Sequence, residues 1–479
     1  MMPEARTETP SPDFTGAPEE NREWVVLERD GYRFPPGLRL NLPLYLSRRF
    51  FRVGNPILLF EHLASTYGRM AHYRIGPSDI VLVNEPEFVR EILIHQAQHF
   101  IKERTQRRMR ILLGDGLITS EGEMHRRQRR IAAPAFHRQR IQAYSELMVE
   151  RAAAMREAWQ PGTEIDVAAE MMRLSLQVVA RTLFAQEVTP EIESISHEVN
   201  AIMKLYNFLI ALPKAEDYLH WPIPGLMRFR RARKRLDTVV HRMIAEHRAS
   251  GEDKGDLLSM LMRSQDAEGD HSGMTDEQLR DEVMTIFLAG YETVANALTW
   301  TWMLLGQNPE AEKKLHVELD EVLAGRLPTL EDIPRLHYTE MVLSESMRLY
   351  PPAWAMGRQA TVDVEIGPYK LPAGTFFFFS QYLIQRNPEH FPHPLHFEPE
   401  RFTPEQKAGR SKFVYFPFGA GNRQCIGESF AWMEMILVLA TLAQHWRLRL
   451  VSGQSFEVQP KITLRPKHGI RVFAEPRAC

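Results

Sequence analysis

One internal cysteine stands in a glycine-rich loop, where its thiol could bind a metal or attack a substrate. Residues 418–427 read Phe-Gly-Ala-Gly-Asn-Arg-Gln-Cys-Ile-Gly, and the apolar run from Phe430 to Leu442 predicts a helix directly after them. The 479-residue chain has two cysteines, and the other, Cys479, is its last residue. A single internal cysteine in this setting is a candidate metal ligand or nucleophile.

The residues around Cys425 favour a bound ligand. Gly419, Gly421 and Gly427 let the backbone turn sharply and approach a flat molecule closely. A position just before a helix should favour the thiolate, and Arg423 offers a positive charge to a carboxylate. Three interpretations compete: dinucleotide binding, for which the third glycine is missing, a buried structural cysteine, and a thiolate ligand of haem iron. Haem ligation explains the glycines, the arginine and the cysteine together.

Composition narrows the class of protein. The chain is 44% hydrophobic and 25% charged, as expected for a globular protein. A net charge of -2 argues against nucleic-acid binding, and two cysteines exclude a disulfide scaffold and suit a reducing compartment, the cytoplasm. Residues 1–22 are rich in Pro, Glu, Thr and Ser and have no apolar core. We expect them to be a disordered tail without a transmembrane anchor, followed by one domain over 23–479.

The elements that must position the cysteine loop are predicted to be mainly helical with small sheets. The segment from Pro86 to about Leu319 is mostly helical in pattern. Its longest helix should begin near Thr275, where Thr275 and Gln278 form a capping box, and continue past Trp302. Strands are expected at residues 70–75, 80–83, 362–366 and 375–380. Within the last of these, the four phenylalanines 376–379 fit a strand buried on both faces.

The cysteine loop resembles the haem-binding loop of the cytochrome P450 family, Phe-x-x-Gly-x-Arg-x-Cys-x-Gly, with every defining position present. The resemblance covers roughly residue 30 to the C-terminus. It implies the P450 fold, in which a long distal helix crosses a buried haem b. It also implies that Cys425 is the metal ligand and that Phe418, Gly419 and Arg423 bind the cofactor.

The predicted long helix contains Ala289-Gly290-Tyr291-Glu292-Thr293. By itself the run indicates tight helix packing at Gly290, which costs about 1 kcal/mol relative to alanine, with Glu292 solvated. Beside a haem loop it resembles the oxygen-activation motif of P450 distal helices. The resemblance implies that Ala289 and Gly290 leave room above the iron and that Glu292 and Thr293 deliver protons as catalytic residues. The family often has Thr or Ser where this chain has Val294.

Two further groups of residues resemble P450 motifs. Glu345 and Arg348, one helical turn apart, match the Glu-x-x-Arg motif, and Arg401 matches its third partner; the resemblance implies a buried ion-pair network on the proximal side. The cofactor's propionates would be bound by four basic side chains. These are His125, Arg129, Arg358 and Arg423.

Other charged clusters have weaker interpretations. Arg126, Arg127 and Arg130 could help dock an acidic electron-transfer partner. The basic run 228–235 is more readily a solvated helix face than a membrane contact. The histidines at 390, 393 and 396 are spaced like metal ligands, but the interrupting prolines Pro392 and Pro394 argue against a zinc site.

The sequence as a whole therefore predicts a haem-thiolate monooxygenase of the bacterial type. It would insert one atom of dioxygen into an apolar small molecule, namely a fatty acid, terpenoid or steroid. By the resemblance, the substrate pocket would be formed by residues 101–117, 200–212, Phe287 and Ala289, 353–356 and 462–464. Electrons would come from a ferredoxin or flavodoxin with its reductase, and the enzyme would be a monomer. The alternatives are a peroxygenase, an isomerase or dehydratase that needs no oxygen, and a haem sensor or carrier. The Glu292–Thr293 pair argues against a peroxygenase, because fatty-acid peroxygenases of the family have Arg-Pro there. The intact distal motif also argues against an isomerase or dehydratase, and oxygen consumption coupled to product formation would distinguish an enzyme from a sensor or carrier.

Overall fold

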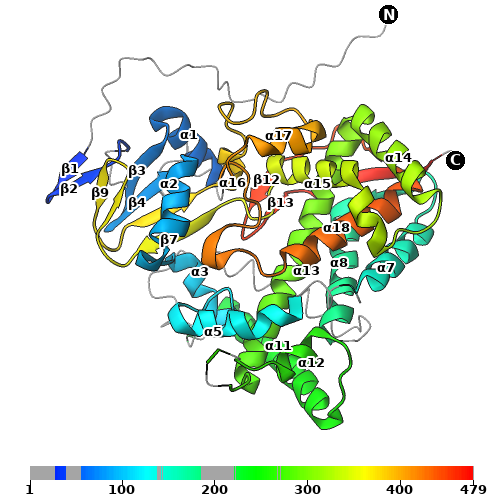
Figure 1. The fold of residues 1–479 in the computed structure, drawn as a ribbon, viewed down its shortest axis with the longest axis horizontal. Helices are drawn as coiled ribbons and strands as arrows, with labels where there is room; N and C mark the ends of the chain where they lie inside the picture. The colour runs from blue at the N-terminus through cyan, green and yellow to red at the C-terminus, as the bar shows by residue number, and fades with distance from the viewer. Residues whose placement is uncertain are drawn as a thin grey trace, which may run out of the picture.

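A helix of 32 residues, α13 (Asp276–Gln307), runs through the middle of the computed structural model (Figure 1). The structure describes residues 27–38, 55–136, 142, 144–184, 221, 223–266, 268–269 and 271–477. The Thr275 hydroxyl accepts a hydrogen bond from the Gln278 N–H at 3.2 Å, and the Gln278 side chain accepts one from the Thr275 N–H at 3.0 Å. The predicted capping box is therefore confirmed, and α13 ends before Pro309.

Helices pack around α13 on several sides. α8 (Val167–Phe184) lies along it, and a Cβ at Gly290 would lie 3.0 Å from Val179 Cγ2, so the glycine permits this close approach. α11 (Pro224–Ser250), α15 (His337–Leu349) and α18 (Glu428–Ala443) also contact α13. The other described α-helices are α1 (Ile57–Tyr67), α2 (Pro86–Arg90), α3 (Arg104–Arg108), α4 (Arg110–Leu113), α5 (Gly122–Ala132), α7 (Ser145–Ala158), α12 (Leu257–Arg263), α14 (Pro309–Leu323), α16 (Gln381–Ile384) and α17 (Pro404–Ala408).

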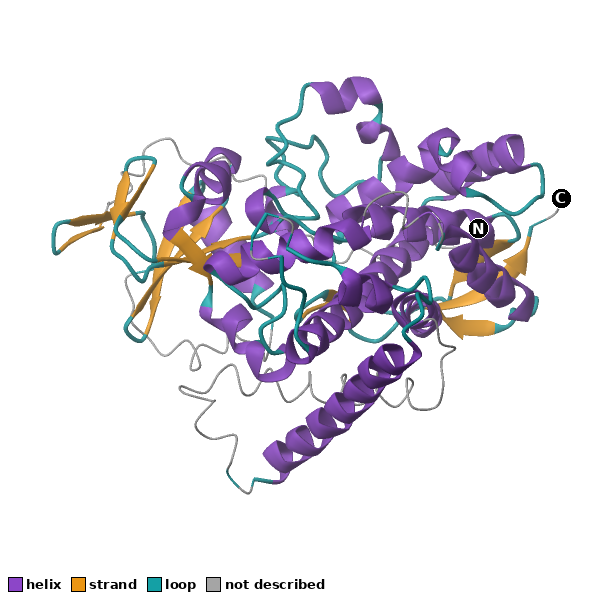
Figure 2. Cartoon of the chain, turned by 60° about the horizontal axis from the view of Figure 1, so that its bottom comes forward, coloured by secondary structure: helices purple, strands orange, loops and turns teal. Residues whose placement is uncertain are grey.

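Most strands gather at two ends of the molecule (Figure 2), whereas one two-stranded sheet lies near the middle (Figure 1). The largest sheet has the order β3-β4-β10-β7-β5, in which β10 is parallel to β4 and antiparallel to β7. Its strands are β3 (Met70–Ile75), β4 (Ser78–Val83), β5 (Phe100–Lys102), β7 (Met356–Ala360) and β10 (Phe376–Phe379). There are three smaller sheets among the described residues. The first has the order β1 (Leu27–Arg29), β2 (Tyr32–Phe34), β9 (Tyr369–Leu371) and β8 (Val364–Ile366), and the second the order β11 (Trp446–Leu450), β14 (Arg471–Pro476) and β6 (Glu164–Asp166). The third pairs β12 (Val458–Pro460) with β13 (Leu464–Pro466).

The predicted fold class, mainly helical with small sheets, is confirmed, but two details differ. Phe377 and Phe379 are fully buried whereas Phe376 and Phe378 are partly exposed, so β10 buries one face completely and not both. The short strands β5 and β6 lie inside the segment predicted to be mostly helical. The predicted tail, residues 1–22, lies outside the described residues. Within the described part of the chain, no helix is long and apolar enough to cross a membrane.

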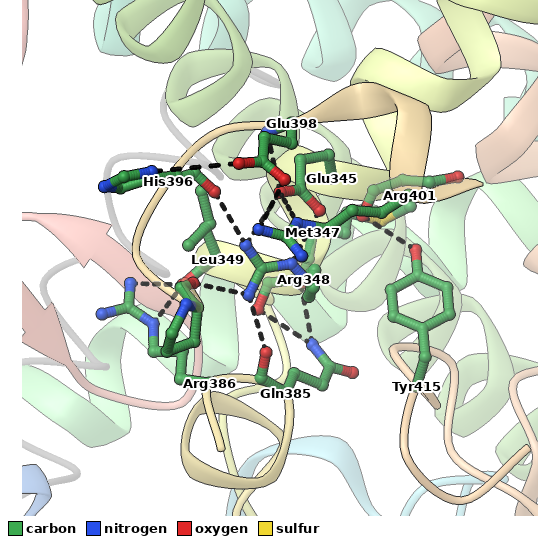
Figure 3. A network of polar contacts seen from close by, with 12 residues as sticks. Glu345, Met347, Arg348, Leu349, Gln385, Arg386, His396, Glu398, Arg401 and Tyr415 are labelled. Atoms are coloured by element: carbon green, nitrogen blue, oxygen red, sulfur yellow. Dashed lines mark hydrogen bonds and ion pairs between the residues drawn. The ribbon is translucent and has the colours of Figure 1, made fainter. Parts of the chain in front are cut away.

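A buried network of polar contacts holds the segment that leads to the cysteine loop (Figure 3). Arg348 Nε and Nη2 donate to the two carboxylate oxygens of Glu345 at 2.6 and 2.8 Å, and both side chains are fully buried. The remaining donors of Arg348 reach the carbonyl oxygens of Gln385, Pro394 and His396 at 2.7–3.1 Å. Arg401 Nε lies 3.4 Å from Glu345 Oε1. The three residues predicted to form this network are thus in contact.

Gln385 connects the network to the cysteine loop. Its side-chain amide donates to the carbonyl oxygens of Met347 and Arg348, and its side-chain oxygen accepts from the Phe416 N–H at 3.2 Å. Phe416 lies two residues before Phe418, whose carbonyl accepts the Cys425 N–H at 2.9 Å. The position of the cysteine therefore depends on α15 through these hydrogen bonds and the short backbone segment from Phe416 to Phe418.

Replacing Arg348 by methionine should destabilise the protein strongly. The Glu345 carboxylate and three loop carbonyls would remain buried without their donor, which should lower the free energy of unfolding by about 3–5 kcal/mol. Urea denaturation followed by circular dichroism measures the loss. The control is Lys407→Met, because Lys407 pairs with Glu340 at 3.0 Å where both side chains are largely exposed, and its loss should cost less than about 1 kcal/mol. Equal stability of the two variants would contradict the role of the network.

Candidate active site

An apolar cavity of about 350 Å³ lies between α13 and the cysteine loop. One wall comes from the face of α13 that carries Ala289, Gly290 and Thr293. The opposite wall comes from the loop and from α18. The loop and α18 contribute Pro417, Phe418, Gly419, Arg423, Gln424, Cys425, Ile426, Gly427, Phe430, Ala431 and Met435. The cavity thus has the two facing walls that a flat cofactor requires.

The backbone of the cysteine loop depends on two glycines. Gly419 and Gly421 both have φ of 73°, a left-handed conformation that residues with a Cβ rarely adopt. A Cβ at Gly421 would also lie 2.4 Å from the Leu93 carbonyl oxygen. Gly427 differs, because its φ is −89° and a Cβ there would meet nothing closer than Phe136 at 3.8 Å. Contacts within the protein thus exclude any side chain at position 421. At position 427 they do not, but a side chain there would take up space in the cavity, because Gly427 lines it.

The Cys425 side chain opens onto the cavity and has protein on its other sides. Burial raises the pKa of this thiol to about 11, although the backbone N–H of Gly427 acts in the opposite direction. In the protein without its cofactor, desolvation thus outweighs the hydrogen bond from the helix start, which is the opposite direction to the one expected from the sequence. A thiolate here requires a cation in contact with the sulfur, which is what a haem iron supplies.

Basic side chains gather at one edge of the cavity. His125 and Arg129 come from α5 and Arg423 from the loop, and all three line the cavity. The fourth predicted residue, Arg358 on β7, is not among the lining residues but lies close enough to Arg423 to feel its charge. Arg129 donates to the Gln424 carbonyl at 2.8 Å and Arg423 to the Ser120 carbonyl at 2.8 Å. Burial and the neighbouring arginines lower the pKa of His125 to about 3, so the imidazole is neutral and can donate one N–H. Burial also lowers the pKa of Arg358, to about 10.

Lys102 is a fifth member of this cluster, and the sequence analysis missed it. It lines the cavity from β5, and its ammonium group donates to the Leu117 and Ile118 carbonyls. Lys102 and Arg358 are direct partners in the antiparallel pairing of β5 with β7. Like charges placed opposite each other destabilise a sheet. Three acids act on the Lys and Arg side chains of the cluster, namely Glu121, which pairs with Arg423, Glu282 and Glu103. The cluster therefore fits the two propionates of a haem.

Glu292 and Thr293, the acid and the alcohol predicted to deliver protons, lie in different surroundings. Thr293 lines the cavity and donates to the Ala289 carbonyl at 2.7 Å. Glu292 points away: its carboxylate accepts from Arg465 Nε at 2.7 Å and Nη2 at 2.6 Å, and from the Thr463 hydroxyl. The Glu292 side chain is only 3% exposed. The expectation of a solvated Glu292, which came from interpreting the run 289–293 as helix packing alone, is therefore wrong. Arg465 and Thr463, on and beside β13, are functional candidates that nothing in the local sequence of α13 indicates.

Other predictions have mixed outcomes. Leu117, Ala353 and Met356 line the cavity as expected, whereas Phe287, Trp354 and the segment 462–464 are not among its lining residues. The predicted pocket region 200–212 lies outside the described residues. Arg130 forms two 2.9 Å hydrogen bonds to the Asp266 carboxylate, and Arg127 donates to the nearby Ser272 and Gly273, so both already hold a loop. Arg126 is largely exposed and pairs with Glu123; docking by these arginines stays a prediction. Among the described residues, no group of His, Cys, Asp or Glu could hold a metal ion.

Comparisons with known proteins agree with this geometry. A cytochrome P450 family model matches residues 35–472. Cyclooctatin synthase of Streptomyces melanosporofaciens is 39% identical over 87% of this chain and 91% of its own. Cyclooctat-9-en-7-ol 5-monooxygenase of the same organism is 40% identical over 82% of this chain and 86% of its own. The crystal structure of a cytochrome P450DA heme domain has the same fold, with a TM-score of 0.83, 24% identity and coverage of 92% of this chain and 97% of its own.

The chain therefore belongs to the cytochrome P450 family. It is a haem-thiolate monooxygenase, which uses dioxygen and electrons from separate redox proteins to oxygenate an apolar organic substrate. Its cofactor is haem b, and the cavity offers a thiol, two facing walls and a cluster of cations to hold it.

Replacing Cys425 by serine should remove the spectral mark of thiolate ligation. The reduced carbon monoxide complex of the unaltered protein should have a strongly red-shifted Soret band, because a thiolate donates electron density to the iron. The Cys425→Ser variant should lose that band even if haem remains bound. Cys479→Ser is the matched control, since it removes the other cysteine of the chain and should leave the band unchanged. A red-shifted band in the Cys425→Ser variant would exclude this cysteine as the ligand.

Proposed function

We propose that this P450 hydroxylates a polycyclic terpenoid. The observation that carries the proposal is the similarity, at about 40% identity over most of both chains, to two Streptomyces enzymes that are named for cyclooctatin and cyclooctat-9-en-7-ol. The cavity supports it, because its distal part is lined mainly by aliphatic side chains. These include Leu117, Ile118, Val179, Leu183, Ile286 and Val294. A rigid hydrocarbon skeleton would bind there by burying apolar surface.

A spectroscopic binding screen tests the substrate class. Displacement of water from the haem by a bound substrate changes the spin state and shifts the Soret band. Polycyclic terpenes should give this shift at micromolar concentration, whereas lauric acid and testosterone, as probes of the fatty-acid and steroid classes, should give at most a weak one. A shift with lauric acid or testosterone and none with any terpene would overturn the proposal.

When bound, the haem supplies the iron at which dioxygen is reduced and one oxygen atom is transferred, and the Cys425 thiolate favours O–O cleavage. The protein's own contribution on the distal side is space and protons. Ala289 and Gly290 have no large side chain on the wall that faces Cys425. Thr293 presents a hydroxyl there that can hold a water molecule in position and pass a proton.

We propose that Glu292 supplies protons to Thr293 by exchanging partners. Its ion pair with Arg465 and its contact with Thr463 hold the carboxylate outside the cavity. Thr463 Oγ1 also accepts from the Asn296 side chain at 3.1 Å, so polar groups continue from Glu292 along the buried side of α13. Because Arg465 is 21% exposed, its guanidinium can be solvated while the carboxylate turns. Proton delivery would then require opening of this ion pair.

Replacing Thr293 by alanine should uncouple electron use from product formation. The variant should keep the Soret spectrum of the parent, yet divert most of the reducing equivalents into hydrogen peroxide, because no hydroxyl would hold the distal water. The ratio of product to NAD(P)H consumed measures this coupling. Thr299→Ala is the control, since Thr299 makes the same bond to the carbonyl four residues earlier, at 2.6 Å, but does not line the cavity. Coupling that stayed high in Thr293→Ala would remove Thr293 from the mechanism.

For the redox partner, we propose a ferredoxin or flavodoxin with its reductase, acting on a monomeric enzyme in the cytoplasm. A surface groove beside the cysteine loop supports this choice, because it brings Arg90 and Lys412 together with Ile94 and Trp432. Positive charge around an apolar centre suits a small acidic electron carrier. This groove is a second proposed docking surface, in addition to the predicted Arg126, Arg127 and Arg130.

A further inference from the structure

A strongly basic segment lies on the N-terminal half of α11, and neither the haem site nor the groove beside the cysteine loop uses it. Residues 228–235 contain six arginines and lysines, and residues 224–236 contain no acidic residue, although the whole chain has a net charge of -2. Like charges one helical turn apart repel each other and destabilise a helix. Because gathering these cations is unfavourable, we expect them to serve a partner of opposite charge.

The fold turns the central cations of this segment outward. The buried side chains of α11, which include Phe229 and Leu236, pack into the helical core, so the apolar face of the helix is already covered. Arg228, Arg231 and Lys234 follow one another at intervals of three residues, and all three side chains are exposed. This spacing places them side by side on the outer surface of the helix. We call these three residues the basic face.

The basic face has no ion-pair partner within the part of the chain that the structure describes. Other cations of the same helix differ, because Arg233 lies 3.7 Å from the Asp237 carboxylate and Arg242 lies 3.7 Å from the Glu246 carboxylate. An anionic surface could therefore bind the basic face without first breaking an ion pair.

Two exposed apolar side chains stand directly before α11. Trp221 is 53% exposed and Ile223 is 45% exposed, and no other large apolar side chain of the described residues is as exposed as Trp221. A tryptophan is well suited to the boundary between lipid and water, because its ring is apolar and its N–H is polar. Exposed aromatic and basic side chains together favour an anionic lipid surface over a small soluble anion.

We propose that this enzyme binds reversibly to the surface of an anionic membrane through the basic face of α11, with Trp221 and Ile223 inserted among the lipid headgroups. A lipid surface adapts to the outside of a single helix, whereas an acidic protein would have to match its shape. The contact would bring the enzyme to the phase in which apolar compounds concentrate. The proposal does not depend on which apolar compound is the substrate.

Membrane binding by α11 would leave the groove beside the cysteine loop accessible. In Figure 1, α11 lies at the bottom of the molecule, whereas α2 and α17 lie well above it. Arg90 of the groove is the last residue of α2, and Lys412 follows α17 closely. An enzyme on the membrane could therefore still accept electrons from a soluble carrier.

Co-sedimentation of the holoenzyme with lipid vesicles tests the proposal. The unaltered enzyme should bind vesicles that contain phosphatidylglycerol, which is anionic, and should not bind vesicles of phosphatidylcholine alone. Salt at about 1 M should release it, because charges are then screened beyond about 3 Å. The triple variant Arg228→Gln, Arg231→Gln, Lys234→Gln should bind the anionic vesicles about a hundredfold more weakly. Its carbon monoxide spectrum should not change.

The matched control is the triple variant Lys313→Gln, Lys314→Gln, Lys370→Gln, which removes three exposed cations from other elements and changes the net charge equally. It should bind the anionic vesicles as the unaltered enzyme does. Trp221→Ser keeps every cation and should weaken the binding as well.

Three results would overturn the proposal. The first is an unaltered enzyme that does not bind the anionic vesicles. The second is an equal loss of binding in the control variant, which would indicate an effect of net charge alone. The third is a triple variant of the basic face that still binds the vesicles but loses turnover with a ferredoxin and its reductase, which would assign the basic face to a protein partner.

Discussion

The fully buried ion pair between Glu345 and Arg348 is the interaction on which the active site depends. Two charges without solvent are tolerated only when every donor and acceptor is used, and Arg348 uses its donors on Glu345 and on three carbonyls of the segment 385–396. That segment has little regular structure of its own. The network gives it a fixed path, and Gln385 transmits the constraint to the loop that carries Cys425.

With the cysteine loop held in place by this network, the two walls of the cavity contribute different chemical groups to the site. The side of α18 and the loop supplies a thiol whose burial favours the neutral form until a metal binds. The side of α13 supplies small residues and hydroxyls, while its acid, Glu292, is stored in an ion pair outside the cavity. The edge supplies cations from α5, β5, β7 and the loop. Each group is held by a different part of the chain, so the cofactor site exists only in the complete fold.

Much of this site could be predicted because its motifs are contiguous. The glycines around Cys425, the run 289–293 and the pair Glu345–Arg348 each lie within one turn or one loop, where local geometry relates the residues directly. Lys102 and Arg465 could not be predicted in this way, since their roles follow from strand pairing of β5 with β7 and from packing of β13 against α13. The three-residue strands β5 and β6 were not predicted for the same reason. They are too short to show an alternating pattern of apolar residues, and they are stabilised by partner strands far away in sequence.

The pairing of Lys102 with Arg358 across β5 and β7 has a consequence for engineering this enzyme. Two facing cations lower the stability of the haem-free chain, and a neutral residue at either position would relieve that repulsion. A selection for thermal stability performed on haem-free protein would therefore enrich such substitutions. If these side chains bind the propionates as proposed, the same substitutions would weaken haem binding. The variants that are most stable without haem would then be among the poorest at retaining it, which is a trade-off between stability and function.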